Sequence, residues 1–197
     1  GMVVKNDDQS VLNQKSLSKA DFSLIHQFAF DHQLPLDILD FKQVYELTDL
    51  VKSTYKEVLS SPLEFVPMDY VDLPDQEYSK AIMSEQVATL DQARTDLPAE
   101  IIDSYQIVRS QPKIMEFLPK NMSKAYGLEI LLHHLGLDFE NLMAFGDAEN
   151  DIEMLKAAHI GVAMDNASDE IKAIADDVTL DHDEDGVAVY LHHYFNM

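Results

Sequence analysis

The second half of the chain alternates short apolar segments with helical segments, and this rhythm restricts the fold more than any other sequence feature. Three apolar segments of three to five residues are expected strands: Leu142–Phe145, Ile160–Met164 and Val178–Leu180. Helical segments surround them: Ser123–Leu135, Asn150–Ala158, Ala167–Ala175 and Gly186–Phe195. Short, fully apolar strands that alternate with helices are typical of a parallel sheet with helices on both faces. We therefore expect an α/β core over residues 120–197.

The first half of the chain arranges its strands as hairpin-like pairs. The expected pairs are Met2–Lys5 with Val11–Leu17, Asp37–Phe41 with Gln43–Leu47, and Gln106–Gln111 with Lys113–Leu118. Helical spacing follows Ser18 and recurs near Asp49–Leu59, Gln86–Arg94 and Pro98–Tyr105. This mixture predicts an α+β domain whose sheet is covered on one face. The predicted domains are therefore the α+β domain over residues 1–119 and the α/β core over residues 120–197.

Composition excludes several classes of function. The 14 basic and 36 acidic side chains give a net charge of −22, and such a chain repels nucleic-acid phosphates and anionic membranes. The absence of cysteine excludes disulfides, thiolate chemistry and cysteine-ligated zinc. No apolar run approaches the roughly 18 residues that span a bilayer, and no signal peptide opens the chain. We expect a soluble, cytoplasmic protein that binds neither nucleic acid nor membrane, with an acidic surplus suited to divalent cations.

The loop after Leu142–Phe145 carries the residues best suited to chemistry. In an open parallel sheet, ligands bind beyond the carboxyl ends of the strands. Gly146 permits a tight turn there, and Asp147, Asn150 and Asp151 follow within five residues. Carboxylate and amide oxygens suit Mg²⁺, which prefers oxygen ligands and retains several waters. Helix capping is the alternative interpretation, but it accounts for one or two of these residues rather than for the whole run.

Lys124 is the second candidate site residue. It follows Ser123, a good N-cap, so its cation lies in the first helical turn and opposes the helix dipole. Taken alone, Lys124 is more simply interpreted as a surface lysine. Beside the carboxylates and a bound phosphate, however, an ammonium group would neutralise charge as a point contact. Asn166, which follows Ile160–Met164, has two interpretations left open: a helix cap or a loop residue that faces the site.

Several segments, taken together in order, resemble one known family. They are Ser123-Lys-Ala-Tyr-Gly-Leu128, Gly146-Asp-Ala-Glu-Asn-Asp151, Ile152-Glu-Met-Leu155, Gly161-Val-Ala-Met164, Asn166-Ala167 and Asp185-Gly-Val-Ala188. They resemble the carboxy-terminal part of phosphatases of the haloacid dehalogenase (HAD) superfamily, in its Cof-type sugar-phosphatase branch. The first half resembles the cap domain of these proteins in its order of elements. The resemblance implies an α/β fold, with a partial HAD-like (Rossmann-type) parallel sheet core plus an α+β cap domain.

The same resemblance implies roles for the site residues. Asp147 would be a Mg²⁺ ligand and Asp151 would support the metal site, so both belong to the implied metal centre. Asn150 would contact the phosphate or the coordination sphere of the metal. Lys124 would bind the phosphate and orient the nucleophile, as the catalytic residue present in this chain. The substrate would be a small phosphorylated metabolite such as a sugar phosphate, attacked by an aspartate that forms an aspartyl-phosphate.

The nucleophile motif is the main departure from the family pattern. Family members carry Asp-x-Asp-Gly-Thr at the end of a buried strand, and no such segment precedes the cap-like region in this sequence. Asp183-Glu-Asp185-Gly-Val187 resembles that motif, but it follows a short strand and a polar turn, where a nucleophile is not expected. We therefore expect this chain to be inactive as it stands. The alternative function is a non-catalytic remnant that binds a divalent metal or a partner chain.

The departure has a consequence for the sheet. In the family, the strand that ends at Asp147 pairs with the strand that bears the nucleophile. Without that partner, Leu142–Phe145 would be an unpaired edge. We expect the chain to borrow a strand, from another copy or from its own amino terminus, or else to be marginally soluble. The predicted partners are thus a phosphorylated metabolite and, for the bare edge, a homo-oligomer or an exchanged strand.

Overall fold

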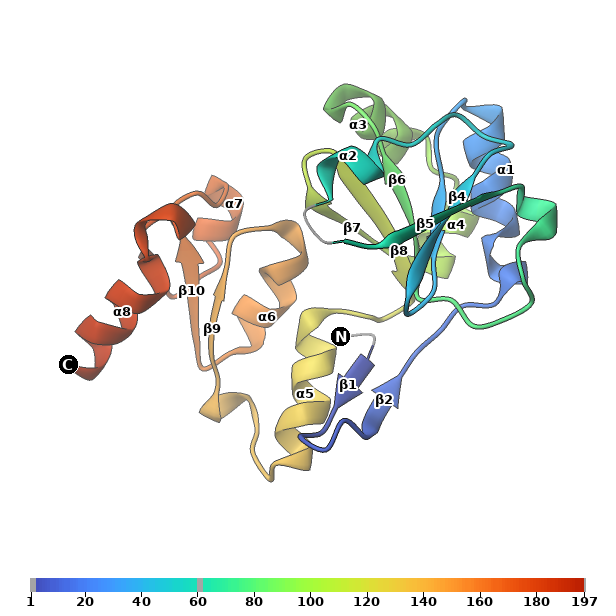
Figure 1. The fold of residues 1–197 in the computed structure, drawn as a ribbon. Coiled ribbons are helices and arrows are strands. Elements are labelled where there is room, and N and C mark those ends of the chain that lie inside the picture. Colours follow the sequence, from blue (N-terminus) through green and yellow to red (C-terminus); the bar gives the residue numbers. More distant parts are fainter. Residues whose placement is uncertain (1–2, 60–61, 197) are drawn as a thin grey trace. The chain divides into compact units, whose positions relative to one another are not determined.

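The computed structural model describes residues 3–59 and 62–196, which divide into two compact units (Figure 1). The six-strand unit consists of Lys15–Met122. The second unit combines Val3–Gln14 with the chain from Ser123 onward. We call it the three-strand unit after its parallel sheet, which has three strands and excludes the hairpin of Val3–Gln14. The sequence placed one boundary at residue 119 and assigned the amino-terminal strands to the first domain. The contacts instead divide the chain after Met122 and group Val3–Gln14 with the second half.

The six-strand unit is built on one mixed sheet with the strand order β5-β4-β3-β6-β8-β7. The strands are β3 (Asp37–Leu39), β4 (Gln43–Leu47), β5 (Glu64–Met68), β6 (Lys80–Ser84), β7 (Tyr105–Gln111) and β8 (Ile114–Pro119). β4 and β5 pair in parallel, whereas the other neighbours are antiparallel. The helical segments are η1 (Lys19–Phe22), α1 (Ser23–Asp31), α2 (Tyr55–Val58), η2 (Tyr70–Asp72), α3 (Val87–Asp96) and α4 (Ala99–Ser104).

The two faces of this sheet carry clusters of very different size. Alternate strand residues such as Ile38 and Met83 pack with α1, α3 and α4 in the main core. The residues between them, such as Leu39 and Ile82, form a smaller cluster with Tyr55 of α2. The α+β character predicted for the first half is therefore present, with most of the apolar burial on one face.

The helix expected near Asp49–Leu59 is much shorter in the structure, where α2 is a single turn. Thr54 is tied to β6 instead: its backbone N–H donates to the Ser84 carbonyl at 3.2 Å, and the two side-chain hydroxyls lie 3.0 Å apart. Bonds to a neighbouring strand hold this backbone outside a helix. Local spacing does not reveal such a long-range competitor.

The three-strand unit has a parallel sheet, as the sequence predicted, and its strand order is β11-β10-β9. Its strands are β9 (Met143–Gly146), β10 (Ile160–Met164) and β11 (Asp177–Thr179). Its helical segments are α5 (Lys124–His134), η3 (Phe139–Asn141), η4 (Glu149–Asp151), α6 (Ile152–Ala157), α7 (Asp169–Lys172), η5 (His182–Glu184) and α8 (Gly186–Phe195). α6 and α7 pack on the sheet through one shared apolar cluster.

Small residues allow α6 to lie very close to this sheet. The facing positions of β9 and β10 are Ala144, Gly146, Gly161 and Ala163. A Cβ atom at Gly161 would collide with the backbone carbonyl of Leu155 in α6. This packing holds the loop between β9 and α6 in a fixed place.

The amino-terminal hairpin does not extend the parallel sheet. β1 (Val3–Lys5) and β2 (Val11–Gln14) pair with each other and pack against α5. Within residues 3–59 and 62–196, β10 is the one strand that pairs with β9. The expectation that the amino terminus supplies a strand to the β9 edge is therefore not met in this structure.

Among the residues that the structure describes, no helix combines the length and the apolar character that a bilayer crossing requires.

Candidate functional site

The carboxyl ends of the three parallel strands bring three polar loops together. Asp147 follows β9, Asn166 follows β10, and His182 lies in the turn after β11. The Asn166 amide Nδ2 donates to Asp147 Oδ2 at 2.7 Å, and the His182 backbone N–H donates to Asn166 Oδ1 at 3.3 Å. The site predicted from the β9 loop thus lies where open α/β sheets bind their ligands.

Asp151 organises the loop that contains Asp147. Its residue surface is only 3% exposed, and its Oδ2 accepts hydrogen bonds from the backbone N–H groups of Asp147 (3.1 Å) and Ala148 (3.2 Å). Its Oδ1 forms an ion pair with the Lys124 ammonium. Gly146 is required beneath it, because a Cβ atom there would lie 2.5 Å from Asp151 Cβ. Both carboxylate oxygens are therefore occupied by groups of the chain itself.

Lys124 begins α5 as the sequence predicted, and its N-cap is formed. The Ser123 side chain accepts a hydrogen bond from the Tyr126 backbone N–H at 3.1 Å. The Lys124 side chain is 45% exposed, whereas that of Asp151 is 4% exposed. An ammonium group has three donors, so the contact with Asp151 leaves donors on the solvent side. A buried anion thus holds a half-exposed cation at the edge of the loop.

Two oxygen atoms near this loop have no hydrogen-bond partner within the described residues. The Asn150 Oδ1 atom is buried and unpaired. Asp147 uses Oδ2 to accept from Asn166, and no hydrogen bond from another described residue engages its Oδ1. A buried acceptor without a donor is uncommon and is expected to have a ligand or water as its partner. Unpaired carboxylate and amide oxygens are the donor set that a hard divalent cation prefers.

The turn after β11 adds residues that the sequence analysis did not assign to the site. The His182 ring Nδ1 lies 2.5 Å from Asp181 Oδ1. That hydrogen bond, together with the nearby charge of Asp183, raises the pKa of His182 above its usual value. The rule that parallel strands end at one edge could have found this turn, since it follows an expected strand.

The Asp183 resemblance to a nucleophile motif has no support in the structure. Asp183 lies in the short turn η5, and its side chain is 91% exposed. β11, which precedes it, is the outer strand of the sheet. The interpretation of this segment as a polar turn is confirmed.

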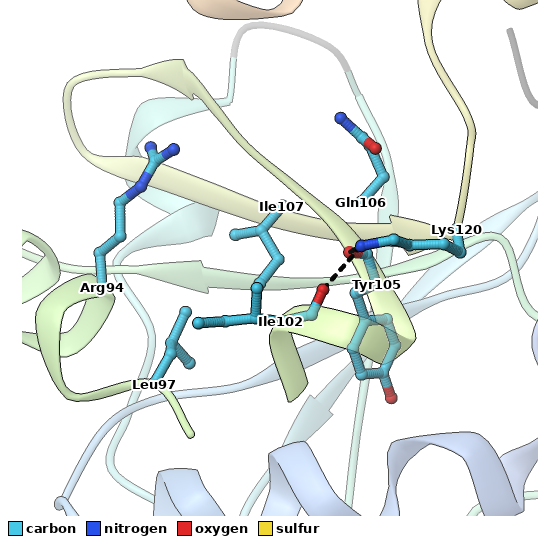
Figure 2. A pocket seen from close by; sticks show the side chains of 7 residues that line it. All are labelled: Arg94, Leu97, Ile102, Tyr105, Gln106, Ile107 and Lys120. Carbon is cyan, nitrogen blue, oxygen red and sulfur yellow. Dashed lines mark hydrogen bonds between the residues drawn. The ribbon is translucent and has the colours of Figure 1, made fainter. Parts of the chain in front are cut away.

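A separate pocket of about 280 Å³ lies in the six-strand unit, where two cations flank an apolar floor (Figure 2). It is lined by Arg94, Leu97, Ile102, Tyr105, Gln106, Ile107 and Lys120. The Lys120 ammonium donates to the backbone carbonyls of Ile102 (2.7 Å) and Tyr105 (3.2 Å). Lys120 therefore stabilises the end of α4. The lining contains no carboxylate or histidine that could act as an acid or base.

Comparisons with known proteins give one family and several relatives. The family model described as haloacid dehalogenase-like hydrolase matches residues 1–191. The chain is 30% identical over 193 residues to chloroplastic endoribonuclease YBEY of Arabidopsis thaliana, which is 96% of this chain and 31% of that protein. It is 38% identical over 113 residues to 5-amino-6-(5-phospho-D-ribitylamino)uracil phosphatase YitU of Bacillus subtilis (strain 168), which is 57% of this chain and 42% of that protein.

A solved structure shares the fold over nearly the whole chain. SMU.1108c from Streptococcus mutans UA159 matches with a TM-score of 0.82 at 25% identity. The match covers 98% of this chain and 73% of that one. The chain spans less than half of the length of the two curated relatives above.

Proposed function

Because this chain belongs to the haloacid dehalogenase-like hydrolases, we propose that it comes from a phosphohydrolase of small phosphorylated metabolites such as sugar phosphates. The superfamily, predicted from the sequence motifs, is confirmed by the family match. We propose the Cof-type branch on the basis of the same motifs. The name of the relative YitU describes a phosphatase whose substrate carries a phosphate on a ribityl chain. That name supports a phosphate monoester of a small polyol or sugar as the substrate class. We propose the cytoplasm as the place where the protein acts.

The ion pair between Lys124 and Asp151 is the observation that carries this proposal. A phosphate monoester is an anion in a chain of net charge −22, so it needs a local cation. Lys124 supplies that cation with donors toward solvent, and nearly buried Asp151 fixes its position. Asp151 also holds the backbone of Asp147 and Ala148, so one carboxylate aligns the phosphate contact and the loop. Such prior alignment lowers the cost of binding.

The residues present fit a magnesium ion. We propose Asp147 as the direct ligand and Asp151 as the residue that supports the metal site, since both Asp151 oxygens already accept bonds from the chain. Asn150, with its buried unpaired Oδ1, would contact the phosphate or the coordination sphere. When bound, Mg²⁺ supplies positive charge that neutralises the phosphate and a fixed point for its oxygens. Lys124 and Asn150 hold and orient the phosphate.

We propose that this chain binds phosphate and metal without turnover. The sequence contains no Asp-x-Asp-Gly-Thr segment, and an ammonium paired with a carboxylate does not attack phosphorus. The non-catalytic remnant remains the alternative function. Phosphate release from p-nitrophenyl phosphate with Mg²⁺ tests this point. Robust turnover would show that a nucleophile is present in the chain and has been overlooked.

Calorimetric titration with inorganic phosphate in the presence of Mg²⁺ tests the site itself. We expect Lys124→Ala to weaken phosphate binding at least tenfold, because the exposed cation is lost. Lys156→Ala, on α6 of the same unit, is the matched control for a loss of one positive charge, and it should bind as the unmodified chain does. Equal losses in both variants would mean that only net charge matters, and the proposed site would be wrong.

A further inference from the structure

Asn166 makes two hydrogen bonds that join three loops of the three-strand unit. Its amide Nδ2 donates to Asp147 Oδ2 at 2.7 Å in the loop after β9. Its Oδ1 accepts from the His182 backbone N–H at 3.3 Å in the turn after β11. Asn166 itself follows β10, the central strand of the sheet. One side chain therefore connects the carboxyl ends of all three parallel strands.

The helix-cap interpretation of Asn166 does not hold in this structure. The N-cap of α7 is Ser168, whose carbonyl accepts from the backbone N–H groups of Ile171 and Lys172, both at 3.0 Å. Asn166 lies outside that cap, and its side chain forms hydrogen bonds to two other loops. The alternative that the sequence left open, a loop residue that faces the site, is the one observed.

The chemistry of the two partners fixes the orientation of the Asn166 amide. An ionised carboxylate only accepts hydrogen bonds, and a backbone N–H only donates. Nδ2 must therefore face Asp147 and Oδ1 must face His182, since the reverse orientation would place two acceptors and two donors in contact. An aspartate at this position would lose the donor and oppose one carboxylate with another. The site thus requires an amide.

We propose that Asn166 is a positioning residue, which holds the Asp147 carboxylate by one oxygen and leaves the other oxygen for a divalent cation. This inference rests on the proposed function. Its support is that Asp147 Oδ2 is bonded to Asn166, while no hydrogen bond engages Oδ1 in the described part of the chain. Removing a residue that hydrogen-bonds to a metal ligand and orients it commonly weakens metal affinity by about 10-fold to 100-fold.

The hydrogen bond itself can be tested without any metal. In the unmodified chain we expect the Asn166 side-chain NH₂ resonances to show slowed exchange with water, measured by NMR on ¹⁵N-labelled protein. Asp147→Ala should return that exchange to the rate of a solvent-exposed amide. Free exchange in the unmodified chain would overturn the inference whatever the chain binds.

A double-mutant cycle tests whether Asn166 acts through Asp147. The test is the Mn²⁺ affinity, determined by electron paramagnetic resonance, of four proteins: the unmodified chain, Asn166→Ala, Asp147→Asn and the double variant. We expect Asn166→Ala to weaken Mn²⁺ binding about tenfold, and to add nothing once Asp147→Asn is present. Ser168→Ala, in the same loop, is the control and should leave the affinity unchanged. Losses that simply add, or an unaffected Asn166→Ala variant, would overturn the positioning role.

The two experiments separate the inference from the function on which it rests. A protected Asn166 amide in a chain that binds no Mn²⁺ would contradict the proposed metal site and the role toward a cation. An unprotected amide in a chain that binds Mn²⁺ would contradict only the role of Asn166. Circular dichroism spectra of every variant, compared with that of the unmodified chain, show whether a changed affinity reflects unfolding.

Discussion

Asp37 has the least ordinary environment of any aspartate that the structure describes. It lies in β3 at 0% exposure, and neither of its oxygens has a hydrogen-bond partner among the described residues. Burial raises the pKa of Asp37 to about 7, and the charge of Glu46 adds to this, whereas the nearby Ser53 hydroxyl opposes it. The folded protein therefore holds a neutral carboxylic acid there below neutral pH.

Asp37 makes the stability of the six-strand unit depend on pH. The unfolded chain loses the Asp37 proton near the usual pKa of 3.8, but the folded chain retains it until about pH 7. The contribution of Asp37 to the free energy of unfolding should therefore fall by roughly 4 kcal/mol between these pH values and stay level above them. Asp37→Asn should remove this fall. The free energy of unfolding of the variant, measured with urea, should therefore rise relative to that of the unmodified protein as the pH increases from 4 to 8.

The control for this prediction is Glu64→Gln, at an exposed position of β5 in the same sheet. It removes one carboxylate without touching a buried site, and its unfolding should follow the unmodified protein at each pH. If Asp37→Asn and Glu64→Gln gave the same pH profile, the buried acid at position 37 would not be responsible.

Gly146 is the residue on which the candidate site depends sterically. In Gly146→Ala the new Cβ would lie 2.5 Å from Asp151 Cβ and 2.8 Å from its Cγ. Asp151 must then move, and its bonds to Lys124 and the loop backbone would be strained. We expect a loss of about 1–3 kcal/mol in the free energy of unfolding, together with weaker Mn²⁺ binding.

Gly136→Ala is the matched control for Gly146→Ala. Gly136 has a φ of +72° and no atom within 4 Å of an added Cβ, so its substitution costs only about 1–2 kcal/mol of backbone strain. It should leave Mn²⁺ binding unchanged, as measured by calorimetry. If both variants kept full Mn²⁺ affinity, the steric fit of Asp151 over Gly146 would not matter to the site.

At the scale of the element, β9 is the exposed edge of a parallel sheet. Parallel sheets are ordinarily covered on both faces. A strand at the edge of a sheet exposes unpaired backbone N–H and C=O groups, which can pair with a strand of another chain. We propose that β9 pairs with a strand from another copy of this chain. Light scattering during size-exclusion chromatography should then show a molar mass that rises with protein concentration.

Met143→Lys tests this edge directly. Met143 begins β9 and is partly exposed, and a lysine on an edge strand disfavours pairing with another chain. The variant should stay monomeric at concentrations where the unmodified chain associates. A compact, soluble monomer of the unmodified chain over the whole concentration range would count against the proposal.

The elements also show which local predictions succeed. β4 and β10 have the predicted bounds, because each strand is bordered by turns and most of its residues are buried. The helix expected near Asp49–Leu59 was wrong over most of its length, since Ser84 competes for Thr54 from a distant part of the sequence. Local pattern succeeds where no long-range partner competes.

For the whole molecule, the two units have separate hydrophobic cores. The main core of the six-strand unit includes Phe22, Tyr78 and Phe117, whereas that of the three-strand unit is a small cluster around Leu155. We expect urea unfolding to show two transitions, with the three-strand unit unfolding first, because it buries less apolar surface.

The substitutions above assign these transitions. Asp37→Asn should shift only the transition of the six-strand unit at pH 8, and Gly146→Ala only that of the three-strand unit. Far-ultraviolet circular dichroism and tyrosine fluorescence can follow both transitions in one titration. A single transition that both variants shift equally would show that the units unfold together.

The sequence by itself determined the class of the core and the main candidates of the site. The short apolar strands set the parallel sheet, and Asp147, Asn150 and Asp151 were nominated from their residue types and spacing. Lys124 was assigned to the site by the resemblance to the family. These features are local, since a strand, a tight glycine turn and a helix cap are each encoded within a few residues.

Only the tertiary structure decided which residues meet. It joined Lys124 to Asp151, brought Asn166 and His182 to Asp147, and grouped the hairpin Val3–Gln14 with the second half of the chain. The physical reason is that strand order and parallel pairing depend on packing between distant segments, which no local pattern records.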